Sequence, residues 1–142
     1  MDMGRLSATQ VERAKRLLTN EGNSGRSSKE CAAAAWLVYQ KLNARLAPLV
    51  GAAGVQALFV RSAKLAQAES VSLTEVATPE GMTKLGACLQ TLEPAEATEV
   101  AAVLFGTFLD LMTTFIGERL TVVVLQSAWP TIEETAPRET KK

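Results

Sequence analysis

Four charged side chains stand in strongly apolar stretches of the chain, and their types could form a polar site. They are Arg61, Asp110, Glu118 and Arg119. A guanidinium and a carboxylate on neighbouring packed helices form paired, charge-assisted hydrogen bonds. The sequence therefore predicts that Arg61 pairs with Asp110 or Glu118, and helix order alone does not choose between them. A structural ion pair is favoured over a catalytic or ligand-binding site.

A second acidic group, Glu93, Glu96 and Glu99, could in principle bind a divalent cation or act as an acid and base pair. These residues fall in the first turns of a predicted helix, where negative charge suits the helix dipole. The chain contains no histidine, which removes the usual general base, imidazole metal ligands and the Glu-x-x-His pattern of di-iron bundles. We therefore expect no catalytic residue, no metal and no cofactor.

Two further motifs are weak. The segment Gly51-Ala52-Ala53-Gly54 precedes a helix but lacks the Gly-Lys-Ser/Thr ending of a phosphate loop, so it predicts a tight corner between helices. The first helix carries Arg13, Lys15 and Arg16, but no aromatic residue lies among them and the formal net charge of the chain is zero. The sequence therefore does not favour nucleic-acid binding.

Cys31 and Cys88 lie far apart, without a CxxC motif, among small apolar residues. This pattern favours buried thiols in a reducing compartment. Residues 1–9 lack the apolar segment that a signal peptide requires. The apolar stretch 100–125 is interrupted by charges, of which Asp110 is the most central, before about 20 apolar residues accumulate. We expect a cytoplasmic protein with no membrane span.

The elements that must position these residues are all helices. Apolar residues recur at helical spacing, and no stretch alternates as a strand would. The predicted helices cover residues 7–20, 27–47, 51–68, 78–92 and 94–128, with a helix end at Pro48. No internal repeat is visible. We therefore predict three parts of the chain: an N-terminal arm helix with its linker (1–26), an all-α bundle of four main helices (27–130) and a flexible charged tail (131–142).

The last predicted helix is too long for a compact domain of this size. An unbroken helix over residues 94–128 would be about 50 Å long, whereas a compact domain of 142 residues has a radius of gyration of about 14 to 15 Å. Either the helix bends at Gly106 or Gly117, or it stays straight and a second copy covers the excess. The sequence therefore predicts a homodimer.

The same helix carries a stripe of small or short side chains. Gly106, Asp110, Thr113, Gly117 and Thr121 recur at intervals of four, three, four and four residues. Such a stripe lets another backbone approach closely. Glycine inside a helix costs about 1 kcal/mol relative to alanine, so we expect these glycines to have a packing role.

Charge is unevenly distributed along the chain. The first part is basic, and between residues 69 and 118 only Lys84 opposes the acids Glu69, Glu75, Glu80, Glu93, Glu96, Glu99, Asp110 and Glu118. Regions of opposite sign can attract each other within one chain or between two copies. A mildly basic arm and an acidic, solvated face is the favoured interpretation.

Three segments together resemble a family of small uncharacterised bacterial helical proteins. They are residues 51–66 (GAAGVQALFVRSAKLA), residues 114–121 (TFIGERLT) and Ala128-Trp129-Pro130. The resemblance covers roughly residues 28–130. It implies a helical fold and a bacterial source, and it implies no reaction.

The sequence thus favours a non-enzymatic module for protein-protein interaction or regulation, acting as a homodimer or on an unknown protein partner through an apolar helical surface. The alternative is a small-ligand binder or an enzyme built around buried Arg61, Asp110 and Glu118. The two hypotheses make different demands on the structure, since only the second requires a cavity lined by those three side chains.

Overall fold

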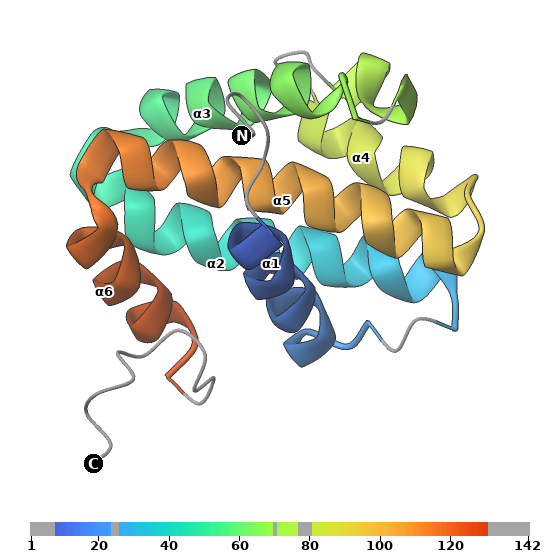
Figure 1. Ribbon diagram of the computed structural model, residues 1–142, viewed down its shortest axis with the longest axis horizontal. Helices are drawn as coiled ribbons and strands as arrows, with labels where there is room; N and C mark the ends of the chain where they lie inside the picture. Colours follow the sequence, from blue (N-terminus) through green and yellow to red (C-terminus); the bar gives the residue numbers. More distant parts are fainter. Residues whose placement is uncertain (1–7, 24–25, 70, 77–80, 131–142) are drawn as a thin grey trace.

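The computed structural model describes residues 8–23, 26–69, 71–76 and 81–130, and this part of the chain is helical without a strand. The helices are α1 (Ala8–Asn20), α2 (Ser28–Val50), α3 (Ala52–Ala66), a short 3-10 helix η1 (Val71–Val76), α4 (Gly81–Gln90), α5 (Pro94–Ile116) and α6 (Glu118–Ala128). The predicted all-α fold is confirmed (Figure 1).

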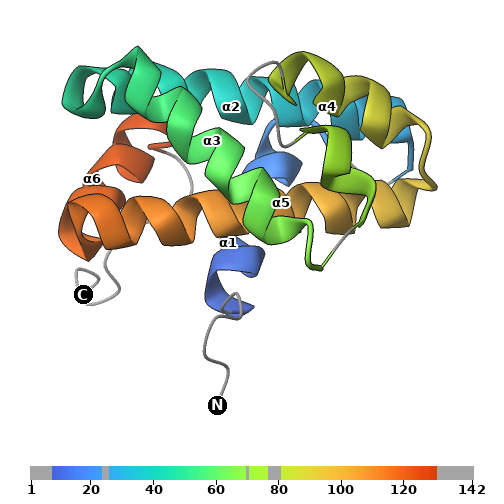
Figure 2. The ribbon, with the colours of Figure 1, turned by 90° about the horizontal axis from the view of Figure 1, so that it is seen from above.

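Helices α2 and α5 form the centre and run in the same direction (Figure 1). From the end of α2 the chain turns into α3, which packs across α5. From the end of α5 it turns into α6, which packs across α2 on the opposite side. Helix α1 packs on α5, and α4 packs on α2 (Figure 2). Each central helix is therefore covered by helices from both halves of the chain.

The two halves repeat one arrangement. Helices α2 and α5 are both 23 residues long, and both end at a corner glycine. Gly51 and Gly117 lie 66 residues apart (117 minus 51), as do the helix starts Ser28 and Pro94 (94 minus 28). Buried positions follow the same offset, as in the fully buried pairs Val38 and Leu104, Leu42 and Phe108, and Leu46 and Met112. The repeat lies in backbone and burial, while the residue identities differ, which is why no repeat is visible in the sequence.

The corners at Gly51 and Gly117 have nearly the same conformation. Their φ and ψ angles are 84° and 155° at Gly51, and 95° and 155° at Gly117. Only glycine adopts this region without a steric penalty. At each corner the glycine N–H donates to the residue four before it (Ala47, 2.7 Å; Thr113, 2.8 Å). Each glycine carbonyl then accepts from the residue four after it, so both helix ends keep their hydrogen bonds.

The predicted helix over residues 94–128 is therefore broken at Gly117, while Gly106 lies inside an uninterrupted α5. The chain folds back on itself, and α6 covers part of its own domain. The length argument for a second copy no longer applies. The expected helix end at Pro48 also shifts, because α2 continues through this proline to Val50.

The core is continuous across all six α-helices. Its largest fully buried side chains include Trp129, Phe105, Phe108 and a set of leucines. The N-terminal helix belongs to this core, since Ala14, Leu17 and Leu18 are fully buried. Helix α5 is long and apolar enough to cross a membrane by length and composition, and 56% of its most apolar window is buried inside the protein. That burial is typical of a core helix.

Candidate interaction surface

The structure does not gather Arg61, Asp110 and Glu118 into one site. Arg61 is exposed on α3 and Asp110 is half-buried on α5. Glu118, on the first turn of α6, accepts a hydrogen bond from Arg13 Nη2 at 3.4 Å. Among the described residues, Arg61 forms no ion pair with either acid. The predicted buried pair is therefore corrected to an exposed pair between α1 and α6.

The helix geometry explains this difference. The buried face of α3 is made by Val55, Phe59, Ser62, Ala63 and Ala66, which leaves Arg61 on the solvent side. The break at Gly117 then directs α6 to the opposite side of the α2 and α5 layer from α3 (Figure 1). Glu118 therefore lies on the side of α6 and α1, away from Arg61.

Helix α1 packs on the small-residue stripe of α5. A Cβ atom on Gly106 would lie 3.2 Å from both N and Cα of Val11 and 3.3 Å from the carbonyl carbon of Gln10. Gln10 Nε2 also donates to Thr113 Oγ1 at 3.5 Å. The predicted close approach of a backbone is confirmed at Gly106, and that backbone belongs to the same chain.

The remaining stripe residues have other roles. Gly117 forms the corner between α5 and α6. Thr121 is fully buried, and its hydroxyl has no hydrogen-bond partner among the described residues. Asp110 contributes its backbone carbonyl, which accepts from Thr114 Oγ1 at 3.0 Å.

Charged contacts attach α1 to the acidic part of the chain. Lys15 Nζ lies 2.8 Å from Glu99 Oε2 on α5, and Arg13 contacts Glu118 on α6. The hydrogen bond to Glu99 raises the pKa of Lys15. Both carboxylates are largely exposed, so each pair contributes only about 0 to 1 kcal/mol. The basic and acidic regions thus attract each other within one chain.

A more enclosed polar cluster joins three distant parts of the chain. Glu21 follows α1, Lys41 lies on α2 and Trp129 follows α6. Glu21 Oε2 accepts from Trp129 Nε1 at 2.7 Å and from Lys41 Nζ at 2.5 Å. The Lys41 ammonium also lies 5.8 Å from the centroid of the Trp129 ring, within cation-π range.

The pKa of Glu21 reflects this enclosure. Burial removes water from the carboxylate and raises its pKa, but the hydrogen bonds from Lys41 and Trp129, together with the Lys41 charge, outweigh that effect. The pKa of Glu21 is lowered as a result. Sequence reasoning missed this cluster. The available signals were an acid inside a turn-rich linker and a tryptophan directly before the proline that follows α6.

Neither Cys31 nor Cys88 forms a disulfide; Cys31 is buried and Cys88 is half-buried. Burial raises the pKa of the Cys31 thiol, although a hydrogen bond with Thr98 opposes this. Within the described residues, no group of three or more acidic, cysteine or histidine side chains could hold a metal ion.

Exposed apolar side chains gather instead near the two glycine corners, which lie at the same end of the molecule (Figure 1). We call four of them the corner face: Leu49 (48% exposed) at the end of α2, Phe115 (66%) two residues before Gly117, and Leu120 (37%) and Val123 (52%) on α6. The described part of the chain has only three other large exposed apolar residues, Trp36, Leu37 and Leu65.

A groove of about 260 Å³ runs between α2 and α6 at the corner face. Leu49, Leu120 and Val123 are among its walls, and Arg45 is its one charged lining residue. Two other hollows lie elsewhere. One of about 390 Å³ follows the outer side of α3 beside Arg61 and Lys64. The other, of about 520 Å³, lies between α2 and α4 beside Trp36.

Comparisons with family models, with curated proteins and with solved structures give no match. Function must therefore be inferred from the chemistry of the surface.

Proposed function

We propose that this protein is a non-enzymatic interaction module that binds a helical partner through the corner face. The observation that carries the proposal is that three exposed apolar side chains, Leu49, Leu120 and Val123, line one groove. Single exposed apolar side chains are normal, but a contiguous group beside a groove is typical of a protein-binding surface.

The energetics favour a covered state. Covering one large apolar side chain contributes about 1.5 to 3 kcal/mol, so burial of the two most exposed members, Phe115 and Val123, could supply several kcal/mol toward association. A groove between two helices is also the usual receptor for the apolar face of a third helix. The alternative built on Arg61, Asp110 and Glu118 gains no support from the geometry, because Arg61 is exposed on α3 whereas Glu118 contacts Arg13 of α1.

A second copy of the chain would be such a partner and corresponds to the expected homodimer. In an isologous dimer the same four side chains of both copies would be covered together. Two cysteines that form no disulfide fit a reducing interior such as the cytoplasm. The resemblance to small bacterial helical proteins adds a bacterial source to this proposal.

The test uses a synthetic, fluorescently labelled 16-residue amphipathic helix with leucines at helical spacing and glutamine on its other face. We expect it to bind the full-length protein with a micromolar Kd in an anisotropy titration. The double variant Phe115→Ser, Val123→Ser should weaken binding at least tenfold. Both side chains are more than half exposed, so the fold should be preserved, as far-UV circular dichroism would verify.

The matched control is Leu65→Ser, which changes a side chain of similar exposure (46%) on α3. It should leave peptide binding unchanged. Sedimentation velocity over a hundredfold range of concentration tests self-association in parallel. The proposal fails if the corner variant neither weakens peptide binding nor changes the sedimentation of the protein.

A further inference from the structure

The charged residue that lines the groove at the corner face is basic. Arg45 lines the groove between α2 and α6, and no carboxylate lines it. Arg119 is exposed on the first turn of α6, one helical turn before Val123, so the two side chains lie on the same side of that helix. The chain as a whole has equal numbers of acidic and basic residues, whereas the lining of this groove holds an arginine and no acid.

These two arginines also lack partners within the described residues. By contrast, three other cations are neutralised inside the protein: Arg13 by Glu118, Lys15 by Glu99 and Lys41 by Glu21. Glu118 is the acid nearest to Arg119 in the sequence, and its contact is with α1. A guanidinium without a carboxylate partner keeps its full capacity for paired hydrogen bonds.

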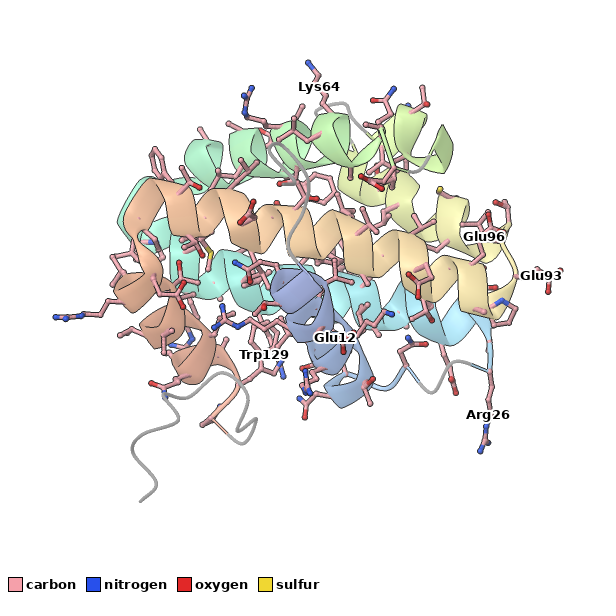
Figure 3. All side chains as sticks on the ribbon, viewed as in Figure 1. Glu12, Arg26, Lys64, Glu93, Glu96 and Trp129 are labelled. Carbon is pink, nitrogen blue, oxygen red and sulfur yellow. The ribbon has the colours of Figure 1, made fainter. Side chains whose placement is uncertain are left out.

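The exposed acids near the start of α5 lie at the other end of the molecule. Glu93 and Glu96 mark that end, where α5 begins (Figure 3). Both acids are exposed. The groove therefore combines apolar walls with unneutralised positive charge, and it lies far from these acids. Charge complementarity then selects a partner that carries carboxylates beside an apolar stripe.

We propose that the groove between α2 and α6 binds an acidic amphipathic helix. This inference rests on the proposed function and names its partner class. The apolar stripe of the partner packs against Leu49, Leu120 and Val123. Carboxylates beside that stripe accept hydrogen bonds from Arg45 and Arg119. The positive charge also accelerates association with an acidic helix, so binding weakens as salt is raised.

The test compares three labelled 16-residue peptides with one leucine pattern, whose flanking positions are all glutamate, all glutamine or all lysine. Anisotropy titrations use the full-length protein at low and at physiological salt. We expect the glutamate peptide to bind at least tenfold more tightly than the glutamine peptide, and the lysine peptide to bind most weakly. The double variant Arg45→Glu, Arg119→Glu should reverse the order of the glutamate and lysine peptides.

The matched control is Arg61→Glu, which reverses an exposed arginine beside the separate hollow on α3. It should leave the preference for the glutamate peptide intact. If all three peptides bind equally and the Phe115→Ser, Val123→Ser variant still abolishes binding, the surface stands as proposed and the acidic partner is refuted. If Arg61→Glu removes the preference instead, the acidic helix binds on α3 and the inference is overturned.

The remaining outcome of the test is that a second copy of the chain occupies the groove. A dimer that persists in the Arg45→Glu, Arg119→Glu variant and disappears in the Phe115→Ser, Val123→Ser variant would show that a second copy covers the groove. That result would overturn the acidic partner and keep the interaction function.

Discussion

Replacement of Gly106 tests how closely α1 packs on α5. In Gly106→Ala the new methyl group would lie 3.2 Å from N and Cα of Val11 and 3.3 Å from the carbonyl carbon of Gln10. These are backbone atoms, so the strain is relieved only if α1 moves as a whole. That movement is restrained, because Leu17 and Leu18 hold α1 in the core.

Two opposing terms set the size of the effect. Alanine is favoured over glycine inside a helix by about 1 kcal/mol, whereas overpacking a close contact costs about 1 to 3 kcal/mol. We therefore expect Gly106→Ala to change the free energy of unfolding by between about 0 and −2 kcal/mol. Gly106→Leu should displace α1 and expose two buried leucines, at about 1.5 to 3 kcal/mol each. That loss is a large part of a typical stability of 5 to 15 kcal/mol.

Urea denaturation followed by circular dichroism measures both effects. The internal control is Gly86→Ala on α4, where nothing lies within 4 Å of the new methyl group. It should gain about 0.5 to 1 kcal/mol from helix propensity alone. The close packing of α1 on α5 would be refuted if Gly106→Ala stabilised the protein as much as Gly86→Ala does.

The remaining predictions concern the cluster of Glu21, Lys41 and Trp129 and the two thiols. Lys41→Met should lower the free energy of unfolding by about 1 to 3 kcal/mol, because the enclosed Glu21 carboxylate loses a charged partner; an unchanged urea midpoint would contradict this. The pKa of Glu21 is lower in the folded protein than in the unfolded chain, so its ionisation stabilises the fold above the unfolded pKa. That contribution disappears as the pH falls through the folded pKa. Urea midpoints measured across the acid range should therefore fall less steeply in Glu21→Gln than in the parent, and parallel curves would exclude this role. With Ellman's reagent, the half-buried Cys88 should react in the folded protein, whereas the fully buried Cys31 should react only at the unfolding rate; equal fast rates would show that Cys31 is accessible.

Local patterns were sufficient to predict the helices and part of their packing. The Gly51-Ala52-Ala53-Gly54 segment predicted a helix corner, and a corner is present at Gly51. The small side chain of Gly106 predicted a close backbone approach, and α1 supplies it. These features depend on the size and conformational freedom of single residues, which the sequence states directly.

The position of the break in the last helix was not predictable in the same way. Gly106 and Gly117 both permit a bend, and the choice depends on which side chains the resulting halves bury. With the bend at Gly117, α6 buries Val124 and Leu125 and brings Trp129 into the core. That outcome is decided by contacts with the rest of the fold, which no local window contains.

The polar contacts depended on the same long-range geometry. Apolar surroundings in the sequence suggested burial for Arg61 and Glu118, but the exposed side of a helix also has apolar neighbours in sequence. Glu21 and Trp129 are separated by 108 positions, and only the crossing of α6 over α2 brings them together. The corner face likewise arises because both glycine corners lie at one end of the molecule.

Amide hydrogen exchange on the full-length chain, at a concentration where sedimentation shows a monomer, is the most direct test that α5 is enclosed by helices of its own chain. The amides between Val100 and Met112 should be among the slowest to exchange, at rates set by global unfolding. Exchange of these amides within minutes in the monomer, with protection gained only as the chain associates, would show that a second copy encloses the helix instead.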